Sequence, residues 1–428
     1  MPDRTTLALV ACASAVLLLN LSLNGDGSSE RTAPPRPRLP DLAPRRAAAL
    51  PKQCARHAEA FTRIEADINA LRDAEINSEA LRGALQSAWR ANHKTGVLLL
   101  NCSGVYVLGN RRALSDAHVW RCLKGLRDSV ASALLAHRRA SCAVPLPLLL
   151  NFEASARPPS RKRFPTFSYC KAPGSADVLF PRYYFDEAHK WSSPNSREEF
   201  RLDRESFAWS EKAAAAAFRG ASTDTTRIDL AALSAKWAAD ADGGSSSSDR
   251  LLDAGITEYL EPAASSWRAS HENRTLPAVA PYVSMREQVK GYRYLVNAEG
   301  AGWACADRFL ALLSSDSLVL KQQSTNVEFW YHLLQPGEHY VPVATDWHNL
   351  RARILQLRAN DSAAAAIAAN ARAFVGGFSA EVSVCAALKA VAEYAALATP
   401  ARWEETVRGL LAAPHLPLVE VYSAARKT

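Results

Sequence analysis

The chain has 428 residues, 48% of them hydrophobic, and carries a net charge of +8. This length and apolar content allow two domains with sizeable cores. The positive charge is compatible with an anionic nucleotide or a membrane surface. No RNA- or DNA-reading motif accompanies it, so composition gives no support to a nucleic-acid-binding protein.

The N-terminal segment, residues 1–24, contains the apolar stretch Thr6–Leu23. As a helix, this stretch would be about 27 Å long, near the hydrocarbon thickness of a bilayer. It predicts a membrane anchor. A cleaved signal peptide is the alternative, disfavoured because only Arg4 precedes the stretch and no A-x-A site ends it. Both interpretations place the rest of the chain in the secretory lumen, and Ala424–Thr428 is no KDEL-type signal. We expect a type II membrane protein of the endoplasmic reticulum or Golgi.

A proline- and arginine-rich stem is predicted over residues 25–57, and an α/β domain over 58–205. In that domain, apolar residues recur at helical spacing from Ala58 to Trp89. The apolar runs Val97–Leu100 and Leu146–Leu150 predict buried strands. An amphipathic helix is predicted between them, over Val119–Ala136.

A second α/β domain is predicted over residues 206–400, followed by a tail over 401–428. Its centre holds three short strand-like runs, which alternate with two segments of helical spacing around Phe309–Leu313 and Phe329–Leu333. The short crossovers predict a parallel, doubly wound sheet, whose ligands lie beyond the carboxyl ends of the strands. The three strand-like runs are Tyr292–Val296, Ser317–Leu320 and Tyr340–Val343. Helices over Ala363–Phe374 and Glu381–Leu397 are expected to pack back across the first domain.

The loop after the first of these strands predicts an anion site. Gly300 and Gly302 allow close backbone approach, and the following helix offers unpaired N–H groups at its start. Arg308, in its first turn, can clamp a diphosphate bidentately. The alternative is an ordinary tight turn with Arg308 in a surface ion pair. The third glycine of the dinucleotide fingerprint is missing, so the loop does not indicate NAD.

Eight cysteines are present, one of them, Cys12, in the apolar leader. None forms a C-x-x-C motif, so zinc and redox roles have little support. In an oxidising compartment the other seven allow up to three disulfides with one thiol left over. Three N-x-S/T sequons, at Asn101, Asn273 and Asn360, fit a luminal protein.

Two short motifs are misleading. Asp186–His189 spells the DEAH box of helicases, but the phosphate loop G-x-x-x-x-G-K-S/T that this chemistry requires does not occur in the chain. Asp240-Ala241-Asp242 matches the metal-binding Asp-x-Asp of many sugar transferases. It adjoins the Gly/Ser-rich run Gly243–Ser248, which indicates a solvated loop.

Several longer sequence segments resemble those of a known family. They are YRYLVNAEGAGW, DRF, SLVLKQQS and VEFWYHLLQPGEHYVPV, preceded by Trp209-x-x-Lys212 and AFRGASTDTTR (Ala217–Arg227). In this order they resemble glycosyltransferase family 90, which includes the Rumi-type and KDEL-containing protein O-glucosyltransferases. The resemblance covers roughly Trp209 to Leu397. It implies a GT-B-like α/β fold, with two facing Rossmann-like domains, the nucleotide-sugar donor in the second and the acceptor in the cleft.

The resemblance also assigns donor-site residues. Arg219, Gly220 and Thr223 match the family's FRG-x-x-T loop, Arg227 its trailing arginine, and Arg308 the arginine that faces the diphosphate. The resemblance implies that no metal or other cofactor is needed, with arginines in the metal's place. Ser222 stands where some members have a second arginine. Glu328 either bonds the ribose hydroxyls or pairs with Lys321. The implied disulfides are Cys54–Cys385 and Cys102–Cys122.

The predicted base departs from the family's pattern. Inverting members carry Asn-x-x-Asp after a strand of the first domain, and here Asn151 is followed by Phe152, Glu153 and Ala154. Glu153, one residue early, is the candidate base. The sequence therefore predicts an inverting transferase that moves glucose or xylose from a UDP-sugar to a protein or glycan hydroxyl. The alternative is a catalytically silent UDP-sugar or glycoprotein binder of the same family.

Overall fold

The structure is a computed structural model. It describes residues 50–74, 76–90, 94–100, 104–109, 119, 145–152, 164–175, 177–181, 206–241, 250–272, 274–300, 305–378, 380–412 and 418–423. Several predictions fall outside these ranges: the leader and most of the stem, nearly all of Val119–Ala136, the Cys102–Cys122 disulfide, and the sequons at Asn101 and Asn273.

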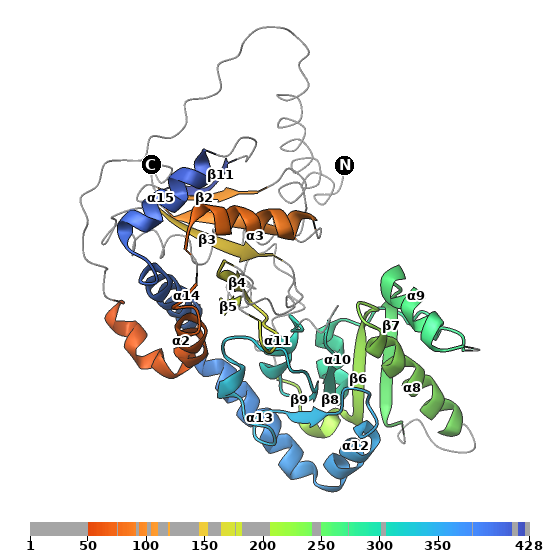
Figure 1. Ribbon diagram of the computed structural model, residues 1–428. Helices are drawn as coiled ribbons and strands as arrows, with labels where there is room; N and C mark the ends of the chain where they lie inside the picture. Colours follow the sequence, from red (N-terminus) through yellow and green to blue (C-terminus); the bar gives the residue numbers. More distant parts are fainter. Residues whose placement is uncertain are drawn as a thin grey trace, which may run out of the picture.

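The second half of the chain forms a five-stranded sheet in the order β10-β9-β8-β6-β7, with every neighbouring pair parallel (Figure 1). The three predicted strands are confirmed as the last three of this sheet in the chain. The strands are β6 (Ala213–Ala221), β7 (Leu252–Glu258), β8 (Tyr292–Asn297), β9 (Leu318–Gln322) and β10 (Val341–Val343). The three central strands β6, β8 and β9 each have a continuous run of buried residues, as expected where helices cover both faces of a parallel sheet.

Helices alternate with these strands. They are α8 (Thr225–Ala241), α9 (Glu261–Ser270), α10 (Met285–Gly291), α11 (Phe309–Leu313), α12 (Leu350–Ala359) and α13 (Asp361–Gly377). The prediction of a helix around Phe329–Leu333 is only partly confirmed, because the segment forms just a short 3-10 turn, η7 (Tyr331–Leu333). Immediately before it, Val327 pairs with Lys171 of the first half as an antiparallel bridge. This extended pairing excludes a longer helix there.

The first half contributes a six-stranded sheet in the order β11-β2-β1-β3-β4-β5. Its strands are β1 (Thr95–Leu100), β2 (Gly104–Leu108), β3 (Leu146–Asn151), β4 (Thr166–Ser168), β5 (Asp177–Leu179) and β11 (Leu418–Ser423). The runs predicted as strands around Val97 and Leu148 are confirmed, but they pair antiparallel. Parallel pairing is confined to β3-β4-β5, so the Rossmann-like pattern is partial in this half.

The last part of the chain lies with the first sheet. Strand β11, from the region predicted as a tail, pairs antiparallel with β2. The leading helices η1 (Lys52–Phe61), α2 (Thr62–Asn69) and α3 (Ser78–Arg90) pack with the late helices α14 (Ala380–Ala395) and α15 (Pro400–Leu411) (Figure 1). The predicted Cys54–Cys385 disulfide is confirmed and joins η1 to α14. Of the two late helices expected to pack there, α14 does, whereas α13 packs on β9.

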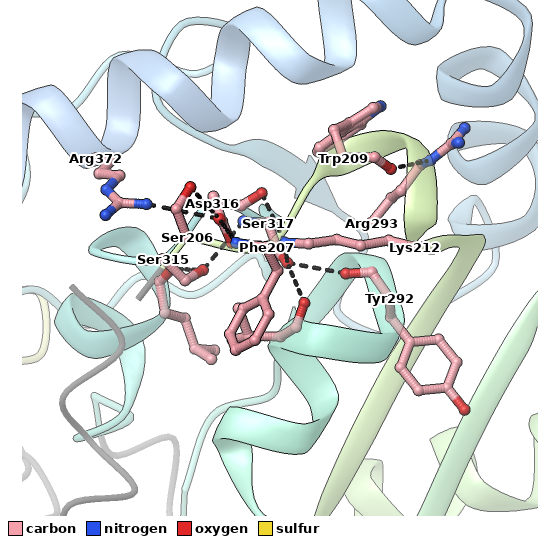
Figure 2. A network of polar contacts seen from close by, with 12 residues as sticks. Ser206, Phe207, Trp209, Lys212, Tyr292, Arg293, Ser315, Asp316, Ser317 and Arg372 are labelled. Atoms are coloured by element: carbon pink, nitrogen blue, oxygen red, sulfur yellow. Dashed lines mark hydrogen bonds and ion pairs between the residues drawn. The ribbon is translucent and has the colours of Figure 1, made fainter. Parts of the chain in front are cut away.

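A buried polar network ties the start of the second sheet to the segment that enters it (Figure 2). Lys212 has a fully buried side chain and donates to the Asp316 carboxylate at 2.6 Å and to Ser317 Oγ at 3.0 Å. The Phe207 N–H also donates to Asp316, at 2.6 Å. The Trp209-x-x-Lys212 motif is thereby explained structurally, because the Trp209 indole donates to Asp361 at the first turn of α13.

Among the described residues, no single helix has both the length and the apolar character needed to cross a bilayer. Asp361–Gly377 and Glu381–Ala395 meet the requirement only as a pair, with a 60° bend between them.

Candidate functional site

The candidate site lies at the carboxyl edge of the second sheet, where β6, β8 and β9 end. In an all-parallel sheet this edge collects the loops that bind ligands. Here Gly220 lies near the end of β6, the loop residues Ala298–Gly300 follow β8, and Arg308 precedes α11. Residues more than 80 positions apart in sequence therefore meet at one place.

Arg308 is held against the end of β6. Its Nη1 donates to the Arg219 carbonyl oxygen at 2.8 Å, and its guanidinium carbon lies 5.0 Å from the centre of the Phe218 ring. Gly220 is what permits this approach, since a Cβ at that position would lie 2.9 Å from Nη2 of Arg308. Any other residue at position 220 would push the guanidinium away. Gly220, the Arg219 carbonyl and the Phe218 ring thus fix the position of Arg308.

Arg227, on the first turns of α8, is a second cation at the same place. It is 6% exposed and donates through Nε and Nη2 to the carbonyls of Glu299 (2.7 Å) and Ala298 (3.0 Å). Burial, followed by the positive charge of Arg308, lowers its pKa to about 10. Two guanidinium groups therefore lie beside Gly220, and an anion placed between them would relieve their repulsion.

Arg219 does not join this pair. Side chains alternate along a strand, so Arg219 projects from the face of β6 opposite to that of Phe218 and Gly220. Its guanidinium donates to the Asp253 carboxylate at 2.8 Å and to the Asp253 carbonyl at 2.8 Å, both on β7. The expectation that Arg219 and Arg308 grip one diphosphate is thus not met. The backbone carbonyl of Arg219 positions Arg308, whereas the side chain of Arg219 forms an ion pair with Asp253.

Glu299 is a residue that the sequence predictions missed. It is 1% exposed, and its carboxylate accepts from Lys321 Nζ at 2.6 Å and from the Ala306 N–H at 2.9 Å. Its own N–H donates to the Gln322 side chain, and its carbonyl accepts from Arg227. Glu299 therefore fixes the loop after β8 against β9, α8 and the approach to α11. An acidic residue directly after a buried strand was the available signal.

The remaining predicted residues are placed as follows. Gly300 lies in the loop fixed by Glu299, but Gly302 and Glu153 lie outside the described residues. Thr223 lies between β6 and α8, and its hydroxyl is buried with no hydrogen-bond partner among the described residues. Glu328 is 3% exposed and accepts from the indole of Trp330 at 3.1 Å, while Lys321 pairs with Glu299. The structure therefore offers Glu328 a local role that neither sequence alternative included.

A disulfide between Cys170 and Cys305 links the two halves of the molecule beside this site. Cys170 follows β4, and Cys305 precedes Ala306, whose N–H binds Glu299. The segment that carries Arg308 is therefore attached covalently to the first half. The number of disulfides seen among the described residues is within the predicted maximum, but the sequence did not indicate this pairing.

Comparison with known proteins agrees with the motifs at this edge. The model of glycosyl transferase family 90 matches residues 145–406. Protein O-glucosyltransferase 1 of Mus musculus is 30% identical over 223 residues, which are 49% of this chain and 51% of the relative. Protein O-glucosyltransferase 3 of Homo sapiens is 30% identical over 210 residues, 48% of this chain and 36% of the relative. The chain spans about half the length of the curated relatives it matches, or less.

A solved structure also shows a likeness: the C-terminal domain of a glycosyl transferase group 1 family protein from Francisella tularensis. It is 13% identical, with a TM-score of 0.25, over 47% of this chain and 95% of that chain. This score is too low to define the fold, which rests on the strand topology. The family model, in contrast, matches more than half of the chain. The chain belongs to glycosyl transferase family 90.

Proposed function

We propose that the protein is a glycosyltransferase that moves glucose or xylose from a UDP-sugar to a hydroxyl of a protein or glycan acceptor. The donor binds at the carboxyl edge of the second sheet and the acceptor in a cleft facing it, the GT-B arrangement. The observation that carries this proposal is the convergence of Arg227 and Arg308 beside Gly220. Family membership and the O-glucosyltransferase relatives support it.

The two arginines would stabilise the departing UDP. As the sugar–oxygen bond breaks, negative charge grows on the diphosphate, and fixed guanidinium groups stabilise that charge without reorganising. Removing one such contact typically costs a few kcal/mol, or about 10²–10³ in rate. In this mechanism the cations take the part that a divalent metal has in other sugar transferases. We therefore expect activity to persist in excess EDTA.

Inversion at the sugar carbon requires a base that takes the proton of the acceptor hydroxyl. Glu153 is our candidate for this role, and a positioned carboxylate contributes about 10²–10⁴ in rate. Ala154, at the position of the family's aspartate, favours a second function. In that case the protein binds a UDP-sugar or a glycoprotein without turnover.

One assay separates the two functions. Purified protein is incubated with UDP-glucose or UDP-xylose, and the release of free sugar and UDP is followed over time. Release by the wild type that is lost in Glu153→Gln supports the transferase. Binding of UDP without release above background supports the silent binder. No binding of UDP by the wild type contradicts both the transferase and the silent UDP-sugar binder.

We also propose that the protein resides in the endoplasmic reticulum or Golgi lumen, held by the segment before residue 25. Two features support an oxidising, luminal environment: the disulfides Cys54–Cys385 and Cys170–Cys305, and the exposed sequon residue Asn360. Cleavage of Asn360-linked glycan by endoglycosidase, seen as a mass shift, would test this location.

A further inference from the structure

Asn297, the last residue of β8, has a buried carboxamide that finds no partner among the described residues. Its exposed fraction is 0%, and neither Nδ2 nor Oδ1 has a hydrogen-bond partner within the described part of the chain. Buried polar side chains nearly always have a partner, and a missing one weakens stability. The position lies directly before Ala298 and Glu299, whose carbonyls hold Arg227.

The carboxamide belongs to a row of polar side chains at the carboxyl edge of the sheet. Asn297 is in register with Lys321 on β9. On the other side Leu295 is in register with Ala217 of β6, so two residues further along Asn297 and Arg219 share one face. Arg219 pairs with Asp253 and Lys321 with Glu299, and Nε of Arg219 is also buried without a partner among the described residues. Both cations of the row are engaged, whereas the amide between them has no hydrogen-bond partner in the described part of the chain.

An isosteric leucine would fit the interior of a parallel strand at lower cost than an unpaired amide. Such groups are typical of functional sites, where stability is sacrificed for binding. We propose that Asn297 is a donor-recognition residue, whose carboxamide receives its hydrogen bonds from the bound nucleotide-sugar. This assignment rests on the proposed function and specifies how the donor is selected at the same edge of the sheet.

The carboxamide of Asn297 restricts which chemical groups can satisfy its hydrogen bonds. It presents an acceptor, Oδ1, next to a donor, Nδ2. A phosphate oxygen only accepts, so a phosphate would satisfy Nδ2 and leave Oδ1 unpaired. Both atoms are satisfied by a group that donates and accepts side by side. In a UDP-sugar this is either the imide edge of the uracil or a pair of neighbouring sugar hydroxyls.

The test is a binding comparison by calorimetry with UMP, UDP and UDP-glucose, using the wild type and Asn297→Leu. Loss of a buried hydrogen-bonded amide should weaken binding about tenfold or more. If the amide binds uracil, all three ligands lose affinity. If it binds the sugar, only UDP-glucose does. The ligand-free variant should be as stable as the wild type or more so, because an unpaired buried polar group has been removed.

Tyr294→Phe is the matched control. Tyr294 is on the same strand, its hydroxyl is also buried and unpartnered among the described residues, and its side chain lies in the core on the opposite face of the sheet. The Tyr294→Phe variant should bind all three ligands with unchanged affinity. A loss of affinity equal to that of Asn297→Leu would overturn the assignment. If Asn297→Leu does not fold, Asn297→Ala is measured by the same criterion.

A folded Asn297 variant that binds all three ligands within about twofold of the wild type overturns the assignment and leaves the proposed function intact. If the wild type binds none of them, the proposed function fails, and the assignment fails with it.

Discussion

At the scale of single residues, the site is defined by two cations that the fold holds together. Arg227 is nearly fully buried, and its neighbour Arg308 contributes to lowering its pKa to about 10. At neutral pH both groups remain charged, so their mutual repulsion weakens the ligand-free fold. A diphosphate bound between the two guanidinium groups would offset this repulsion.

Arg308→Ala should therefore reduce UDP affinity by about 10-fold to 100-fold, because a charge-assisted contact to the diphosphate is lost. Arg308→Lys should be intermediate, since an ammonium keeps the charge but not the bidentate geometry. Calorimetric titration with UDP measures both. The control is Arg408→Ala, which removes an exposed arginine on α15 paired with Glu404. Unchanged affinity in Arg308→Ala would exclude that residue from the site.

Tyr292 predicts a specific response to alkaline pH. Burial and a hydrogen bond to Asp253 raise the pKa of its hydroxyl to about 12, from an ordinary value near 10. Between about pH 10 and 12 this tyrosine ionises in the unfolded chain but stays protonated in the folded one. Its contribution to stability is complete below pH 10 and disappears as pH rises through 12. The free energy of unfolding of Tyr292→Phe should fall less steeply with pH over this interval. Equal slopes in the two proteins would contradict this account.

The sequence predicted some of these residues and not others, for identifiable reasons. Gly220, Arg227 and Arg308 were predicted because they lie in the sequence segments that resemble the family. Arg219 was grouped with them, although alternation along β6 places its side chain on the other face. Glu299 and Asn297 were not predicted as site residues. The role of Glu299 depends on its partners on β9, on α8 and in the segment before α11. The role of Asn297 depends on its having no partner among the described residues. Neither situation can be recognised from a local sequence pattern.

At the scale of elements, the network around Lys212 fastens the first strand of the second sheet (Figure 2). Lys212→Met should lower the free energy of unfolding by about 3 kcal/mol, because Asp316 would lose its buried partner. Urea unfolding should show a lower midpoint with an unchanged slope. The contrasting variant is again Arg408→Ala, whose exposed pair is worth about 0.5 kcal/mol or less. Similar losses in the two variants would contradict the role assigned to the network.

Elements with strong local patterns were predictable. β8, β9 and β10 follow from short apolar runs, and α14 from its alanine-rich periodicity. The segment around Phe329 has an equally helical spacing, yet most of it is not helical. Its backbone pairs with Lys171, which is 156 positions earlier in the sequence than Val327. Tertiary pairing here outweighs local preference, and such pairing is not visible in a window of a dozen residues.

At the scale of the whole molecule, the Cys170–Cys305 disulfide joins the two halves next to the candidate site. Cys170→Ser with Cys305→Ser should lower stability by about 2–4 kcal/mol, as expected for a bridge that closes a long loop. It should also weaken UDP binding, because the segment bearing Arg308 loses its attachment. Unfolding and calorimetry measure these two effects. The matched control is Cys54→Ser with Cys385→Ser, which removes the bridge between η1 and α14. It should lower stability and leave UDP affinity unchanged; equal effects on affinity would contradict the positional role of Cys170–Cys305.

The placement of β11 has a consequence for how the protein is made. The first sheet is begun by β1 and β2, yet one of its two edge strands is β11, from residues 418–423, and α14 and α15 pack on the leading helices. On the ribosome, the second sheet can therefore be finished while the first still lacks its last components. The half that emerges first must wait for residues 418–423, and a stop codon before them would remove a strand that pairs with β2.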